Sequence, residues 1–119
     1  MDTIERAQVR LLLEYLSSEY EAKSDEQQKA MHADHAARGM LQSGATVRES
    51  LRIVETAASN YVKAIVAAVS DVSQDSEAFR MIATDATLLL RTLQVSVDQA
   101  VTLSSGGVGE VNKYPSVSR

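Results

Sequence analysis

The stretch that decides the fold is "VRESLRIVETAASNYVKAIVAAVSDV", residues 47–72. Apolar side chains recur in it at alternating steps of four and three residues, the spacing of one face of an α-helix. Those positions are Val47, Leu51, Val54, Ala58, Tyr61, Ile65, Ala68 and Val72. Thr46 and Glu49 match a capping box, in which each side chain accepts a hydrogen bond from the other residue's backbone N–H. The pattern predicts a helix over residues 47–72 that lies nearly parallel to its neighbours.

A second helical pattern follows directly, over residues 76–103. Asp75 or Ser76 is the expected N-cap, and Glu77 lies in the first turn, where a negative charge favours the helix dipole. The apolar seam, with one polar member, consists of Phe79, Ile82, Ala86, Leu89, Leu93, Ser96, Ala100 and Leu103. Because the link between the two helices is only about three residues long, they should form an antiparallel hairpin.

The N-terminal region, residues 3–42, predicts a third and longer helix. Its apolar side chains form two groups that share one phase across a polar stretch, residues 21–29, which contains neither Gly nor Pro. The two groups are Ile4, Val9, Leu12, Leu13, Leu16 and Tyr20, then Ala30, Ala33, Ala37, Met40 and Leu41. A break near residues 22–27 is the alternative, because Ser24 to Gln27 has capping-box form. An unbroken helix would extend about 20 Å past the hairpin.

Composition supports an all-α helical bundle. Of the 119 residues, only 4% are aromatic, and five Gly and one Pro supply few turns, which disfavours a β-sandwich or barrel. We expect one helical domain over residues 1–103. The tail, residues 104–119, holds three of the five glycines and the only proline. Its segment 111–117 could lie in a groove of this chain or of a neighbouring subunit.

Charge and hydropathy narrow the expected partners and location. The net charge is -4, and no segment carries the basic stripe that a nucleic-acid backbone requires. No apolar run approaches the roughly 20 residues of a membrane span, and the N-terminus is acidic where a signal peptide would be basic. We therefore expect a cytoplasmic protein whose partners are neither nucleic acid nor membrane.

Chemistry-bearing motifs are sparse. Cysteine is absent, and no nucleophile motif is present, so we expect no enzyme activity and no cofactor. His32 and His35 stand three residues apart and could both ligate a metal ion, but no third ligand is evident. We therefore expect both to be ordinary surface histidines. Near the corner at residues 38–48, Arg38 and Arg48 could hold an anion. Ordinary helix capping with surface salt links to Glu49 and Glu55 is the expected explanation of that corner.

Self-association is the function that the sequence favours. Met81, Leu88 and Val95 recur every seven residues, roughly opposite the core seam of residues 76–103, and the overhang of the first helix would also need a partner. Asp34 falls in phase with the apolar face of that helix, so we expect it to be buried at an interface and paired with Arg38. The chain is expected to be a homo-oligomeric assembly or adaptor protein. A module that binds an anion or metal near residues 38–48 is the alternative.

Overall fold

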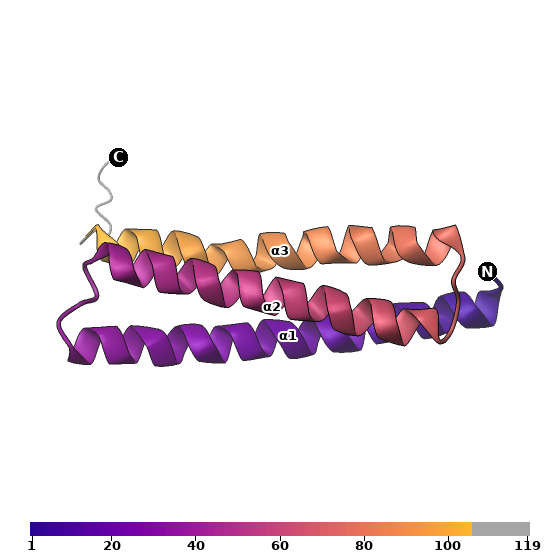
Figure 1. Ribbon diagram of the computed structural model, residues 1–119, viewed down its shortest axis with the longest axis horizontal. Coiled ribbons are helices and arrows are strands. Elements are labelled where there is room, and N and C mark those ends of the chain that lie inside the picture. Colours follow the sequence, from indigo (N-terminus) through magenta and orange to yellow (C-terminus); the bar gives the residue numbers. More distant parts are fainter. Residues whose placement is uncertain (106–119) are drawn as a thin grey trace.

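The computed structural model describes residues 1–105, which form three long α-helices and no strand. Helix α1 spans Thr3–Ala37, α2 spans Gly44–Ser70 and α3 spans Ser76–Ser104. In Figure 1 the helices lie side by side, with α1 and α3 running in the same direction and α2 opposite to both. The N-terminus lies near the turn between α2 and α3. The predicted all-α bundle with its antiparallel hairpin is confirmed.

Local side-chain chemistry sets where the helices begin and end. Asp2 and Glu5 form a capping box at the start of α1: the Asp2 carboxylate accepts from the Glu5 amide at 2.8 Å, and the Glu5 carboxylate accepts from the Asp2 amide at 3.2 Å. Asp75 caps α3, as the sequence predicts, by accepting from the Glu77 amide at 2.8 Å. After α1, Gly39 adopts a φ of +70°, which favours a residue without a Cβ and turns the chain toward α2.

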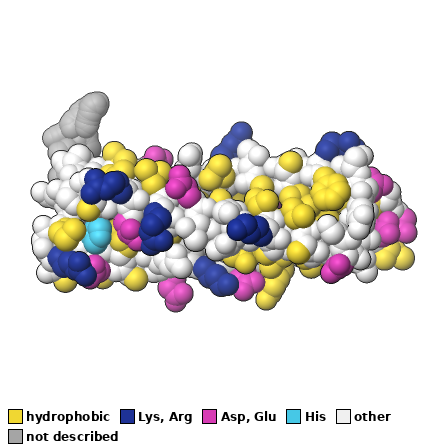
Figure 2. All heavy atoms as spheres, viewed as in Figure 1, with side chains coloured by type: hydrophobic (Ala, Val, Ile, Leu, Met, Phe, Trp, Pro, Cys, Tyr) yellow, Lys and Arg dark blue, Asp and Glu magenta, His cyan; other side chains and the backbone are white. Residues whose placement is uncertain are grey.

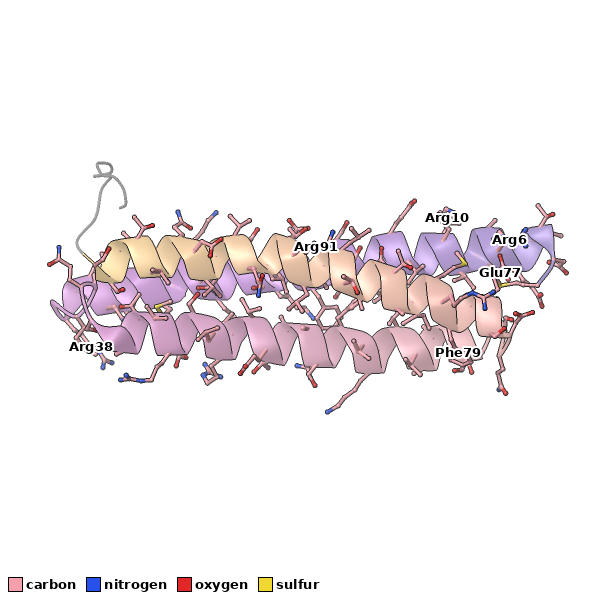
Figure 3. All side chains as sticks on the ribbon, turned by 90° about the horizontal axis from the view of Figure 1, so that it is seen from above. Arg6, Arg10, Arg38, Glu77, Phe79 and Arg91 are labelled. Atoms are coloured by element: carbon pink, nitrogen blue, oxygen red, sulfur yellow. The ribbon has the colours of Figure 1, made fainter. Side chains whose placement is uncertain are left out.

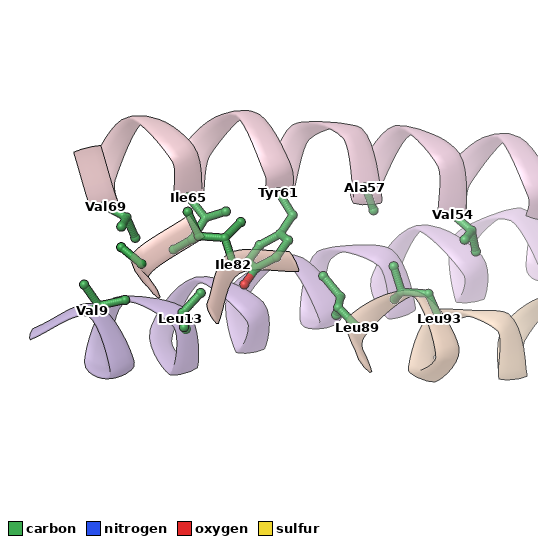
Figure 4. Close-up of a cluster of buried hydrophobic side chains, with 11 residues drawn as sticks. Val9, Leu13, Val54, Ala57, Tyr61, Ile65, Val69, Ile82, Leu89 and Leu93 are labelled. Atoms are coloured by element: carbon green, nitrogen blue, oxygen red, sulfur yellow. The ribbon is translucent and has the colours of Figure 1, made fainter. Parts of the chain in front are cut away.

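The core is a column of apolar side chains from all three helices (Figure 4). Tyr61 and Ile65 of α2 and Leu93 of α3 are its largest fully buried members. Burying one such side chain stabilises the fold by about 1.5–3 kcal/mol, so this column is the main support of the bundle. The cluster consists of Val9, Leu13, Val54, Ala57, Tyr61, Ile65, Val69, Ala78, Ile82, Leu89 and Leu93.

The helix bounds differ in detail from the expectation. α1 is continuous through residues 22–27, so the alternative break is absent, and α1 ends at Ala37 rather than near residue 42. α2 begins and ends earlier than the expected range of 47–72, and α3 extends one residue beyond the expected range of 76–103. Of the expected tail, residues 106–119 and with them the segment 111–117 lie outside the described residues.

The predicted capping box at the start of α2 is wrong. Ser43 is the N-cap, and Thr46 already lies inside the helix, where it is fully buried. Its hydroxyl donates to the carbonyl of Met40 at 3.1 Å, while the Glu49 carboxylate pairs with Arg52. Thr46 therefore ties α2 to the preceding connection and does not cap the helix.

The buried face of α1 is displaced by one residue from the predicted phase. Steps of three and four residues continued from Tyr20 carry the expected face through Lys23, Gln27, Ala30 and Asp34. The buried residues are instead Ser24, Gln28, Met31 and His35. The polar stretch offers no apolar residue larger than Ala22 to fix the phase, and an α-helix drifts by about 20° per heptad relative to a strict seven-residue repeat.

In α2 and α3 the predicted seams are confirmed at their centres and wrong at one edge. Val54, Tyr61 and Ile65 are buried, as are Ile82, Leu89, Leu93 and Ala100 of α3. Leu51 and Phe79 are exposed instead, because they lie on the side of the hairpin that α1 does not cover.

The overhang of α1 is smaller than expected. Its 35 residues span about 52 Å, and the 29 residues of α3 span about 43 Å, which leaves a difference of about 9 Å. The extent of the molecule along its longest axis is 52 Å, the length of α1 itself. The ammonium group of Met1 also bonds the Asp75 carboxylate at 2.9 Å, which joins the start of α1 to the α2–α3 turn. Any surface left for a partner is therefore formed by the side chains of the helix faces.

Candidate functional site

Helix α3 carries exposed apolar side chains on both flanks of its buried stripe. On the flank toward α1, Leu88 is 52% exposed and Val95 is 65% exposed, while Met81 is half-buried against the core. On the flank toward α2, Leu90 is 42% exposed and Phe79 is 41% exposed. After α1 and α2 have packed against α3, one row of apolar side chains remains exposed on each flank of α3.

The first row lies on the α1–α3 face, by which we mean the open side of the groove between α1 and α3. Figure 3 shows α2 along one side of these two helices and Arg10 extending from α1 on the opposite side. Two hollows of about 490 Å³ and 360 Å³ follow one another along this groove. The first is lined by Arg10, Leu13, Glu77, Arg80, Met81, Thr84, Asp85 and Leu88. The second is lined by Glu21, Asp25, Gln28, Lys29, His32, Thr92, Val95, Ser96 and Gln99.

Charges of opposite sign occupy the two ends of the α1–α3 face. Arg10 and Arg80 lie at the end near the start of α1, and Glu21 and Asp25 lie in the second hollow toward the other end. Within residues 1–105, none of these four side chains has an ion-pair partner within 4.0 Å. The first hollow also contains Glu77 and Asp85, and the second also contains Lys29, so the two arginines and the two acids lie among charges of both signs.

Glu77 and Asp85, which line the first hollow, are already engaged. The Arg6 guanidinium donates to the Glu77 carboxylate at 2.8 and 3.2 Å, and this contact holds the pKa of Glu77 below its usual value. Tyr61 donates its hydroxyl proton to the Asp85 carboxylate. Burial, followed by this hydrogen bond, raises the pKa of Tyr61 above its usual value, because the phenolate would be desolvated beside a carboxylate.

The second row lies on the α2–α3 face, the outer side of the hairpin. Figure 2 shows hydrophobic side chains gathered there between α2 and α3, toward the end where α3 begins. A shallow hollow of about 180 Å³ lies between the two helices, with Ala58 and Val62 on one wall and Ala86 and Leu90 on the other. The exposed large side chains of this face are Leu51, Val62, Val66, Phe79, Leu90 and Val101.

This face was not predicted from the sequence, because each helix was expected to have a single apolar seam. The signal was present: Phe79, Ala83, Ala86, Leu90, Val97 and Val101 follow helical steps without a charge. A stripe this wide exceeds what one neighbouring helix covers.

A polar layer joins the three helices beyond the apolar core, and this too was not predicted. The amide of Gln28 on α1 donates to the carbonyl of Ser50 on α2 at 3.1 Å, and the Ser50 hydroxyl donates to the carbonyl of Ser96 on α3 at 3.3 Å. The Gln28 and Ser50 side chains are buried. Buried polar groups of this kind restrict helix register, because a shifted register would leave them without partners.

The expectation of two surface histidines is wrong for His35, which is buried. Its Nδ1 lies 2.8 Å from the Thr46 hydroxyl oxygen, and because Thr46 donates its proton to Met40, the imidazole must be the donor. His32 is half-buried, and burial together with His35 lowers its pKa. Among residues 1–105, no group of three or more His, Cys, Asp or Glu is arranged to hold a metal ion.

The predicted pair of Asp34 with Arg38 is present, at 3.2 Å within the chain, and the Asp34 side chain is 52% exposed in the single chain. The one-residue shift of α1 puts His35, not Asp34, on the buried side. At the corner at residues 38–48, the groups that could hold an anion are therefore partly engaged. Arg38 pairs with Asp34, and the Arg48 side chain lies over Gly44.

Comparisons with protein families, with curated proteins and with solved structures found no match to this chain. Within the described part, no helix is both long enough and apolar enough to span a membrane. The physical features of the helix faces are therefore the basis for the function proposed below.

Proposed function

We propose that this chain is a non-enzymatic assembly or adaptor protein that acts by self-association and by packing its helices against a protein partner. The observation that carries the proposal is the width of the apolar surface of α3. Leu88 and Val95 on one flank, and Phe79, Leu90 and Val101 on the other, remain exposed after α1 and α2 have packed. Apolar rows at helical spacing are the surfaces that helices of other chains bury.

The two faces suit different occupants. The α1–α3 face is mixed, with apolar residues between separated charges, and such a pattern favours a specific partner. The α2–α3 face is more continuously apolar and suits the apolar stripe of an added helix. A homodimer formed through the α1–α3 face would leave two α2–α3 faces free for a partner, which is the arrangement of an adaptor.

Paired substitutions on α3 test the proposal. Leu88→Asp and Leu90→Asp introduce the same charge on opposite flanks of α3, at positions of similar exposure. Gln94→Asp introduces that charge at an exposed polar position and is the control. We expect the unaltered chain to be an oligomer by light scattering after size exclusion, and Leu88→Asp to dissociate it while circular dichroism stays helical. Gln94→Asp should change neither.

The outcomes separate the surfaces. Dissociation by Leu90→Asp alone would move self-association to the α2–α3 face. A monomer for the unaltered chain at 100 µM would refute self-association altogether.

A further inference from the structure

The charge pattern of the α1–α3 face indicates how two copies pair. Building on the self-association proposed above, we infer that this face binds the same face of a second copy in an antiparallel two-fold dimer. Leu88 lies on the two-fold axis, and Arg10 of each copy lies against Asp25 of the other.

Two independent midpoints place the axis at the same level of the bundle. On α3, Leu88 is midway between Met81 and Val95, so a two-fold axis through Leu88 packs Met81 of one copy against Val95 of the other. On α1, the midpoint between Arg10 and Asp25 falls at residues 17–18. These midpoints are 70 to 71 positions apart in sequence.

The contacts between α1 and α3 show that these midpoints face each other. Arg6 bonds Glu77, 71 positions later, near one end. Gln28 and Ser96, 68 positions apart, line the same hollow near the other end. A residue of α1 therefore lies level with the residue of α3 about 70 positions later. One axis serves both helices, and the small side chain of Ser17 is near it on α1.

The same axis brings one pair of opposite charges together. Turning the copy end over end brings its Asp25 to Arg10, and it does so twice because of the symmetry, while Glu21 comes level with Glu14 and Arg80 with Ser96 of the copy. Opposed potentials favour the correct register of two surfaces and disfavour others. A parallel pairing of the faces would place α1 over α3 of the copy at the same level and bring Arg10 to Arg80, which are like charges.

The available area is sufficient for a stable dimer. A face about 40 Å long and about 18 Å wide, the width of two adjacent helices, covers roughly 700 Å² on each copy. The total of roughly 1,400 Å² falls within the usual range of specific protein–protein interfaces.

The absence of cysteine from the chain allows a direct test of the axis. Leu88→Cys on the full chain should form an intermolecular disulfide under mild oxidation, because only residues near the axis bring their Cα atoms within about 7 Å of their symmetry mates. Leu90→Cys is the matched control, since it has similar exposure on the other flank. Cross-linking is read on a non-reducing gel at micromolar protein.

Charge reversal tests the pairing. Arg10→Glu alone and Asp25→Lys alone each place two like-charge contacts in the dimer, and each should raise its Kd about tenfold or more. In a mixture of the two variants, each of the two contacts joins opposite charges: one is the original contact of Arg10 with Asp25, and the other joins the two substituted side chains. An equimolar mixture should therefore form a heterodimer with nearly the original Kd. Sedimentation velocity with one variant fluorescently labelled measures this.

Each outcome has a distinct meaning. Efficient cross-linking of Leu88→Cys together with recovery on mixing supports the antiparallel dimer. A dimer that cross-links through Leu90→Cys, or whose reversed variants do not recover on mixing, overturns this arrangement while leaving self-association intact. A monomer at all concentrations overturns both.

Discussion

Removing one hydroxyl from the core should reveal how much the link between α2 and α3 contributes. Tyr61 is fully buried, and its hydroxyl donates to the Asp85 carboxylate. A hydrogen bond to a charged group contributes about 1.5–3 kcal/mol. Asp85 lines the open α1–α3 groove, so water can hydrate its carboxylate again in Tyr61→Phe. We therefore expect a loss near the lower limit, about 1.5 kcal/mol, or a melting point lower by about 6 °C.

The burial of Tyr61, together with its hydrogen bond to Asp85, also predicts a dependence on alkaline pH. The pKa of Tyr61 is raised in the folded state, so above pH 10, its usual pKa, the unfolded chain loses this proton while the folded chain keeps it. The free energy of unfolding should then fall by about 1.4 kcal/mol for each further pH unit because of this group. The stabilisation is fully present below pH 10 and is lost as the pH rises toward the folded-state pKa. Tyr61→Phe should lack this part of the decline.

Urea denaturation followed by circular dichroism between pH 7 and 11 measures both effects. Tyr20→Phe is the matched control: its ring packs edge-on against Tyr61, with centroids 6.0 Å apart, and within residues 1–105 its hydroxyl has no hydrogen-bond partner in the protein. It should cost less than about 0.5 kcal/mol. Equal losses for the two variants, or an unchanged alkaline slope in Tyr61→Phe, would show that the Tyr61–Asp85 contact contributes nothing specific.

Two further substitutions test the corrected phase of α1. Thr46→Val removes the buried hydroxyl that accepts from His35 and donates to Met40. It should lower the free energy of unfolding, measured by urea denaturation, by about 1–3 kcal/mol. Thr102→Val changes an exposed threonine of α3, so it should have little effect and serves as the control. Asp34→Ala breaks only a surface ion pair, so its melting point should stay within about 2 °C of the original; a drop above 5 °C would mean that Asp34 is buried after all.

The sequence by itself determined the number and type of the secondary-structure elements. Apolar residues at helical spacing, the N-cap at Asp75 and the short link after α2 were enough to predict three helices and an antiparallel hairpin. These are local signals: spacing and capping act within a few turns and do not depend on what packs outside the helix. The single-helix prediction for the N-terminal region was confirmed for the same reason, because no helix breaker interrupts residues 21–29.

Only the tertiary structure decided which side of each helix faces inward. A rotation of α1 by one residue places His35 against Thr46 and leaves Asp34 in solvent, and the polar stretch contains no bulky apolar residue that could have fixed this rotation. The polar layer of Gln28 and Ser50 requires three helices in one register, which no single segment encodes.

The candidate interaction surface divides in the same way. The spacing of Met81, Leu88 and Val95 could be read along one helix, and the exposure of Leu88 and Val95 agrees with it. The grouping of Arg10 with Arg80, and the alignment of residues 17–18 with Leu88, arise only when α1 and α3 lie side by side. Periodicity within a helix is a property of the sequence, whereas the level of one helix relative to another is set by the packing between them.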